Sequence, residues 1–186
     1  MTVFLETDRL LLRQFTPDDL GALYELDGDP DVIRWTNLDG RRAPYALYRD
    51  VLLPRNLAYH AQYPGYGYWV AIEKATGDWL GWFHFRPARD APDEIELGYR
   101  LHKSAWGRGY ATEGALALVR KGFRELGTAR VSATALAANR ASIRVMEKAG
   151  LRHKSDYTYE FTDPETGQVT GHPAVQYALD RRDFVG

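Results

Sequence analysis

The chain has no cysteine, and no stretch of it is apolar over the length that a membrane helix needs. Without cysteine, disulfides, thiolate nucleophiles and cysteine metal sites are excluded. A helix that spans a bilayer needs roughly 20 apolar residues. The first residues also lack the basic start and apolar stretch of a signal peptide. We therefore expect a cytoplasmic protein with no membrane partner.

The chain also has little net charge, because 24 lysines and arginines are balanced by 25 aspartates and glutamates. A net charge of −1 argues against non-specific nucleic-acid binding, which depends on an excess of cations. The five histidines show no spacing typical of metal ligands, so we expect scattered structural or surface histidines and no metal site. A length of 186 residues suits one domain over residues 1–186.

Apolar periodicity and turn residues predict a mixed α/β fold for this domain. The expected strands cover residues 9–15, 68–73, 79–86, 94–101, 130–136 and a final hairpin with strands near 157–161 and 175–179. The expected helices cover residues 17–27, 31–35, 44–62, 111–126 and 139–149. We expect Pro54 to end or kink the helix over 44–62.

The most informative segment is the glycine turn, residues 104–113, between an expected strand and an expected helix. Gly107 and Gly109 allow the backbone to turn tightly and a ligand to approach the main chain. The first amides of the following helix have no acceptor within that helix, so they can bind a phosphate or pyrophosphate. The segment has neither the third glycine of a dinucleotide fingerprint nor the Gly-Lys-Ser/Thr of a P-loop. A purely structural role for the two glycines remains open at this point.

Two further motifs accompany the glycine turn. Glu-Ile-Glu-Leu-Gly-Tyr precedes it at residues 94–99, while Asn-Arg-Ala-Ser at 139–142 and Glu-Lys-Ala-Gly-Leu at 147–151 open and close the last expected helix. In this order, over nearly the whole chain, the motifs resemble the GNAT N-acetyltransferase superfamily, and within it the RimJ/RimL-type ribosomal-protein N-terminal acetyltransferases. The resemblance implies a mostly antiparallel sheet of about seven strands, splayed at a cofactor gap and flanked by about four helices.

The resemblance also implies that acetyl-CoA is the cosubstrate. It would lie in the gap between residues 94–101 and 130–136, with its pyrophosphate on the amides of residues 108–112. The implied cofactor-binding residues are Leu101, Trp106, Gly107, Arg108, Gly109, Tyr110, Ala111, Thr112, Asn139 and Ser142. Trp106 departs from the family pattern, which has Gln or Arg there, so one side-chain contact to the cofactor is lost. The physics of the turn agrees, because amides and the helix dipole attract phosphate and Arg108 can add charge.

The family also suggests which residues carry the chemistry. Many members have a tyrosine that protonates the leaving thiolate, but here that position is Met146. We expect Ser142, or water held by it, to take this role. Glu96 is the candidate base for the amine, with a solvated strand face as the alternative. Asn139 has two compatible roles, as an N-cap and as a contact of the pantetheine arm.

The acceptor is an amine, and Trp35 and Tyr99 are its candidate contacts. Aromatic residues crowd the first third of the chain; core packing accounts for most of them, and the rest can line an acceptor groove. No dense acidic cluster indicates a polycationic acceptor, which favours a peptide N-terminus or a smaller amine. A small-molecule amine, a non-catalytic acyl-CoA sensor and a nucleotide-binding protein remain as alternatives. Exposed strand edges in the final hairpin make a homodimer plausible.

Overall fold

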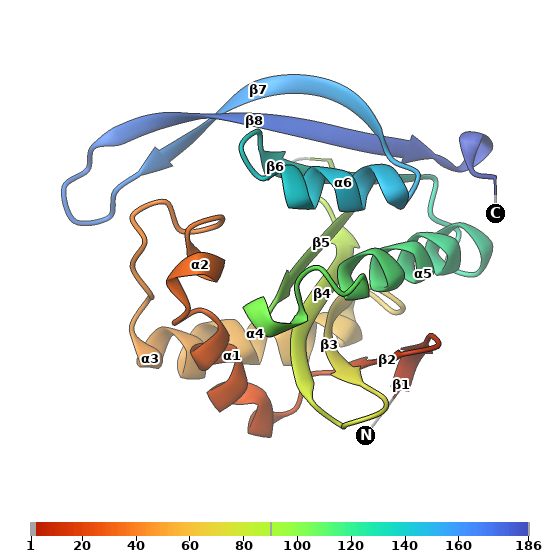
Figure 1. The fold of residues 1–186 in the computed structure, drawn as a ribbon, viewed down its shortest axis with the longest axis horizontal. Coiled ribbons are helices and arrows are strands. Elements are labelled where there is room, and N and C mark those ends of the chain that lie inside the picture. The colour runs from red at the N-terminus through yellow and green to blue at the C-terminus, as the bar shows by residue number, and fades with distance from the viewer. Residues whose placement is uncertain (1–2, 90, 186) are drawn as a thin grey trace.

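A computed structural model describes residues 3–89 and 91–185 (Figure 1). Its centre is one eight-stranded sheet in the order β1-β2-β3-β4-β5-β6-β8-β7. All neighbouring strands are antiparallel except β5 and β6. The strands are β1 (Val3–Glu6), β2 (Leu10–Gln14), β3 (Gly67–Glu73), β4 (Trp79–Pro87), β5 (Ile95–Leu101), β6 (Arg130–Leu136), β7 (Arg152–Thr162) and β8 (Val169–Asp180).

Helices cover both faces of the sheet, with α5 and α6 on the opposite side from α1 and α4 (Figure 1). They are α1 (Leu20–Leu26), α2 (Pro30–Ile33), α3 (Tyr45–Leu47), α4 (Leu53–Gln62), α5 (Tyr110–Arg124) and α6 (Arg140–Lys148). A π-helical turn at Tyr48–Leu52 joins α3 to α4. None of the helices in the described ranges is long and apolar enough to cross a membrane.

Alternation along β4 decides which side chains face which layer, because neighbouring strand residues point to opposite faces. Phe83 and Phe85 are fully buried on the α5 side. There they meet Gly114 and Gly122 of α5, where an added Cβ would lie 2.4 and 2.5 Å from the two rings. The helix therefore packs closely against the sheet, and Trp82, His84 and Arg86 are left for the opposite face.

The structure confirms the expected fold class and corrects several boundaries. The sheet has eight strands in place of about seven, because Val3–Glu6 pairs with β2; residues 1–2 lie outside the described residues. The final hairpin is much longer than expected, since β7 begins at Arg152 and β8 at Val169. The expected helix over 44–62 is interrupted by the π-helical turn just before Pro54, which takes a first-turn position of α4.

The sheet is splayed between its two parallel strands, as expected. β5 pairs with β6 only at Ile95–Val131 and Glu96–Ser132. Beyond that point β6 continues along β8, while the backbone of β5 after Glu96 keeps β4 as its partner among the described strands. The splay therefore opens a gap between two neighbouring strands in the middle of the sheet.

Candidate active site

A cavity of about 750 Å³ occupies the splay. It is lined by β5 and β6, by the glycine turn, and by the N-terminal half of α6. Two residues of β5, Tyr99 and Leu101, point to the face of the sheet that α5 covers. Because neighbouring strand residues point to opposite faces, the alternate residues of β5 point to the face that α1 and α4 cover. These are Glu96, Gly98 and Arg100. The cavity includes residues of both sets, so it passes through the sheet from one face to the other.

The glycine turn has the backbone that its sequence predicts. Gly107 has a φ of +72° and Gly109 a φ of +86°, a left-handed conformation that costs residues with a side chain. Gly109 caps α5, whose first intrahelical bond runs from the Glu113 amide to the Gly109 carbonyl, at 3.0 Å. The amides of Tyr110, Ala111 and Thr112 precede that bond and lie along the cavity wall. The turn therefore presents free amides at a helix N-terminus, the kind of group that can bind an anion.

Two side chains of the turn are held by contacts within the protein. Trp106 donates its Nε1 hydrogen to the carbonyl of Leu101, at 2.8 Å, which ties the turn to the end of β5. The guanidinium of Arg108 lies 3.3 Å from a carboxylate oxygen of Glu73 and 5.0 Å from the ring centre of Tyr110. Arg108 is the one predicted cofactor residue outside the cavity lining. The sequence predicted that the Arg108 charge would face the phosphate. In the structure the Arg108 guanidinium instead pairs with Glu73.

Glu113 compensates the helix dipole, and it also anchors the start of the chain. Its carboxylate accepts hydrogen bonds from the Thr7 hydroxyl at 2.5 Å and from the Arg9 amide at 2.9 Å. Burial raises the pKa of Glu113, but these hydrogen bonds and the Arg9 charge outweigh burial and lower the pKa. The residue joins β1–β2 to α5 and keeps the glycine turn in place.

At the other wall of the cavity, α6 begins with the expected cap. The Asn139 side chain accepts a hydrogen bond from the Ser142 amide, at 3.1 Å. The Tyr99 hydroxyl lies 3.0 Å from the Ser142 carbonyl and 2.9 Å from its Oγ. Since the carbonyl can only accept, the single Tyr99 proton goes there, and the Ser142 hydroxyl donates to Tyr99. Met146 is fully buried in the same wall and has no proton to give.

Tyr99 spans the splay, because it connects β5 to the first turn of α6. Burial raises the pKa of its hydroxyl to about 12. The hydroxyl therefore stays protonated at neutral pH. It is a neutral hydrogen-bonding partner for Ser142.

On the α1–α4 face, Glu96 is the only carboxylate among the described residues that line the cavity. Its Oε2 lies 2.7 Å from Nη2 of Arg86 on β4. Arg100 forms an ion pair with Asp27 at the end of α1. His84 lines the cavity between these two pairs.

The sequence interpretation missed His84 and Arg86. The sequence interpretation gave His84 no part in the site, but its side chain is 15% exposed and lines the cavity. Alternation and the pairing of β4 with β5 put residues 82, 84 and 86 opposite 100, 98 and 96. Glu96 was already a predicted site residue. The strand register identifies Arg86 as its direct partner and His84 as the next residue of β4 on the same face. Among the described residues, no group of three or more His, Asp or Glu side chains is placed to hold a metal.

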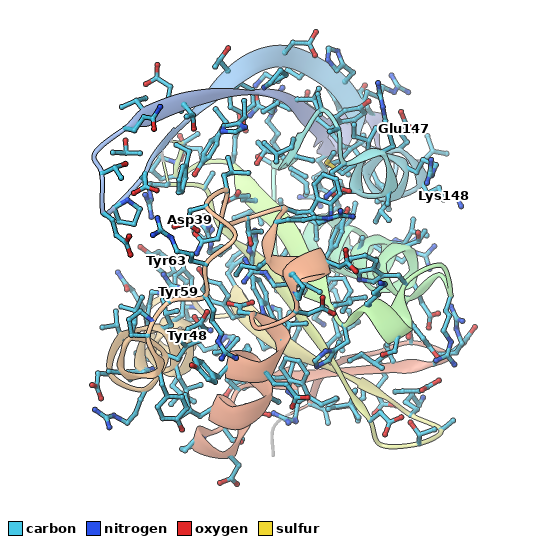
Figure 2. The ribbon with its side chains drawn as sticks, turned by 60° about the vertical axis from the view of Figure 1, so that its left-hand side comes forward. Asp39, Tyr48, Tyr59, Tyr63, Glu147 and Lys148 are labelled. Atoms are coloured by element: carbon cyan, nitrogen blue, oxygen red, sulfur yellow. The ribbon has the colours of Figure 1, made fainter. Side chains whose placement is uncertain are left out.

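Most aromatic residues of the first third of the chain pack the core, as expected. Figure 2 shows Tyr48, Tyr59 and Tyr63 gathered in the α3–α4 layer, away from Glu147 and Lys148 on α6. Tyr48 is buried and donates to Asp27, at 2.9 Å. Trp35, which follows α2, is the predicted acceptor contact that lines the cavity from this region.

Comparisons with known proteins agree with this geometry. The family model described as an acetyltransferase (GNAT) domain matches residues 9–152. An Aspergillus fumigatus protein named FsC-acetyl coenzyme A-N(2)-transacetylase is 31% identical over 189 aligned residues, which cover 97% of this chain and 77% of that protein. The chain belongs to the GNAT acetyltransferase family. It is therefore an N-acetyltransferase, and acetyl-CoA is its cosubstrate.

Solved structures show the same fold with different acceptors. RimL, a ribosomal L7/L12 alpha-N-protein acetyltransferase in complex with coenzyme A, has a TM-score of 0.76 at 17% identity and covers 96% of this chain and 98% of its own. An aminoglycoside acetyltransferase in complex with coenzyme A and kanamycin has a TM-score of 0.70 at 22% identity and covers 94% of this chain and 96% of its own. At these identities the likeness concerns the fold, so the acceptor of this chain must be argued from its own residues.

Proposed function

We propose that this enzyme acetylates the α-amine of a peptide or protein N-terminus, as RimJ/RimL-type enzymes do. The observation that carries the proposal is the cavity through the splay. Its α5 side has the phosphate-binding amides, and its α1–α4 side has one carboxylate, Glu96. Acetyl-CoA then enters from the α5–α6 side, and the amine enters from the α1–α4 side.

The charges around the acceptor side argue against a polycation. Glu96 is the single acidic residue among the described lining residues, and it is already paired with Arg86. Arg34 and Arg100 also line the cavity, and they form ion pairs with Asp31 and Asp27. Polyamines and aminoglycosides carry several ammonium groups, for which the described lining offers one carboxylate. A single amine beside amide and apolar groups fits better.

The chemistry needs no covalent enzyme intermediate. The neutral amine attacks the thioester carbonyl, the carbonyl oxygen takes the electron pair, and collapse of the tetrahedral intermediate breaks the C–S bond. We propose that the acceptor nitrogen loses its proton on the α1–α4 side of the cavity, where Glu96 is the carboxylate that balances the positive charge. The thiolate takes a proton from Ser142, whose hydroxyl turns from Tyr99 to the sulfur.

A small-molecule amine is the second candidate acceptor. The N(2)-transacetylase name of the Aspergillus relative favours it. Trp35, Trp82, Tyr157 and Tyr159 all line the cavity and would suit an apolar or aromatic molecule with one amine.

The test is release of free thiol from acetyl-CoA with a matched panel of acceptors. The panel contains N-terminal peptides, the same peptides with blocked N-termini, single amino acids, aromatic amines, polyamines and aminoglycosides. Turnover with free but not blocked peptides would support the first proposal. Turnover confined to a small amine would replace it with the second. Calorimetric titration with acetyl-CoA, in the same buffer, checks that every preparation binds the cosubstrate.

A further inference from the structure

The acceptor face of the cavity contains a row of polar side chains from two paired strands. Trp82, His84 and Arg86 of β4 lie opposite Arg100, Gly98 and Glu96 of β5. Nitrogen atoms of Trp82, His84, Arg86 and Arg100 in this row are enclosed and have no hydrogen-bond partner within the described residues. Such polar groups are costly inside a protein unless water or a ligand reaches them, and His84 and Arg100 of this row line the cavity.

His84 occupies the middle of this row, directly above a glycine. A Cβ added to Gly98 would lie 2.3 Å from Cε1 of the imidazole, so only glycine leaves room for the ring. Rings of Tyr68 and Trp82 flank the imidazole, each with centres 5.9 Å away. His84 is thereby held in one position beside the cavity.

The two nitrogens of His84 have different surroundings. Nε2 is enclosed, and it lies 3.9 Å from Oε2 of Glu96, just beyond hydrogen-bond reach. No hydrogen bond to Nδ1 is found in the described part of the chain. His60 is different, because both of its ring nitrogens contact backbone carbonyls, at 3.1 and 3.0 Å. His60 is a structural histidine, whereas His84 keeps a free lone pair.

Burial, together with the cations near it, keeps the His84 imidazole neutral. Burial is the main cause that holds the pKa of His84 well below its usual value, and the cations of Arg86, Arg100 and Arg55 act in the same direction. Glu96 is the one carboxylate that approaches the ring, and Arg86 balances it. A neutral imidazole can accept a proton, which an imidazolium cannot.

We propose that His84 takes the proton of the acceptor amine at Nδ1, while Nε2, which lies 3.9 Å from Oε2 of Glu96, carries the other ring hydrogen. The inference rests on the proposed function and adds a catalytic residue to it. As the C–N bond forms, the nitrogen becomes positive and gives one proton to Nδ1, and the imidazolium is then paired with the Glu96 carboxylate. The C–S bond breaks and the thiolate takes a proton from Ser142. The proton on His84 goes to water and Ser142 regains a proton from water, so both residues return to their starting state. The products are the amide and free coenzyme A.

The experiment compares His84→Gln and His84→Ala with the wild-type enzyme, by thiol release with the best acceptor of the panel. We expect kcat to fall by about 10²–10⁴-fold, the range for loss of one general acid–base group, while calorimetry shows unchanged acetyl-CoA binding. Added imidazole should restore part of the turnover of His84→Ala and none of that of Ser142→Ala. His153→Gln is the matched control, because His153 lies on β7, is exposed, and does not line the cavity.

A second variant tests the same residue without removing it. Gly98→Ala should displace the imidazole and lower kcat, while acetyl-CoA still binds. Full turnover of His84→Gln in an active enzyme would overturn the inference, and so would a His84→Ala defect that imidazole leaves unchanged. If the wild-type enzyme turned over no amine of the panel, the proposed function would fail first. The two failures are therefore distinguishable.

Discussion

At the scale of single residues, we propose that the hydroxyl pair of Tyr99 and Ser142 takes the proton-donating role that Met146 cannot fill. The pair brings together residues 43 apart in the sequence, on β5 and α6. Ser142 has the only hydroxyl proton of the pair that is free to turn, because Tyr99 donates to a backbone carbonyl. This arrangement supports Ser142 as the donor to the thiolate, with Tyr99 as the group that positions it.

Ser142→Ala should lower kcat by about 10²-fold or more, as expected for a lost general acid, with a much smaller effect on acetyl-CoA binding. Tyr99→Phe should give a smaller loss, since water can replace a positioning hydroxyl. Both are measured as thiol release across a pH series. Ser155→Ala is the control, because Ser155 lies on β7 outside the cavity lining. Unchanged turnover of Ser142→Ala at every pH would contradict the assignment.

At the scale of elements, the groups that the glycine turn presents to the cavity depend on its backbone conformation more than on its side chains. Trp106 and Arg108 are both engaged elsewhere. We propose that the cofactor phosphates bind the amides at the start of α5, which Gly107 and Gly109 orient. Backbone amides require no particular side chain, so this proposal is compatible with Trp where the family pattern has Gln or Arg.

Gly109→Ala should lower the free energy of unfolding by about 1–2 kcal/mol, the cost of a left-handed residue with a side chain, and should weaken acetyl-CoA binding. Gly77→Ala is the matched control. Gly77 has a φ of +79° in the turn between β3 and β4, and an added Cβ would meet nothing within 4 Å there. It should lose similar stability in denaturant titrations but bind acetyl-CoA normally. Equal loss of binding in both variants would show that the turn is only structural.

At the scale of the whole molecule, the long β7–β8 hairpin lies beyond the residues that the family model matches. Its tip reaches back to the segment after α2 (Figure 1), where Arg41 lies 2.7 Å from Asp163 and also contacts Glu165. Tyr157 and Tyr159 of β7 line the cavity. The acceptor side is thus shaped by two distant segments. β7 is also a sheet edge, and homodimer formation through it stays a prediction.

Acid stability is a property of the whole molecule that one buried pair should influence. Asp19 is 4% exposed, and its carboxylate oxygens lie 2.7 Å from both terminal nitrogens of Arg13. Burial raises the pKa of Asp19, but hydrogen bonds from Arg13 and Thr16 outweigh burial and lower it below the usual 3.8. The unfolded chain therefore takes up the proton first. The stabilisation that the Asp19–Arg13 pair contributes is complete at pH values above the pKa of Asp19 in the unfolded chain. It is lost as the pH falls through the lower pKa of Asp19 in the folded protein.

Asp19→Asn should thus destabilise the protein near neutral pH by about 3–5 kcal/mol, because Arg13 is left buried without its partner. Between pH 5 and 3 the wild-type protein should lose more stability than the variant, which no longer has this proton to bind. Urea titrations at several pH values measure both slopes. Asp18→Asn, at an exposed neighbouring position, is the control. Parallel slopes for wild type and Asp19→Asn would contradict the assignment.

The sequence by itself determined the local features of this protein. Glycines at 107 and 109, the cap at Asn139 and the period-2 strands depend on backbone chemistry within a few residues, so they were predictable, and the order of the motifs was sufficient to indicate the family. The tertiary structure decided which distant residues meet. Alternation gives the face of a strand residue but not its partner. Only the register of β4 on β5 places His84 over Gly98 beside Glu96, and only the splay brings Ser142 to Tyr99.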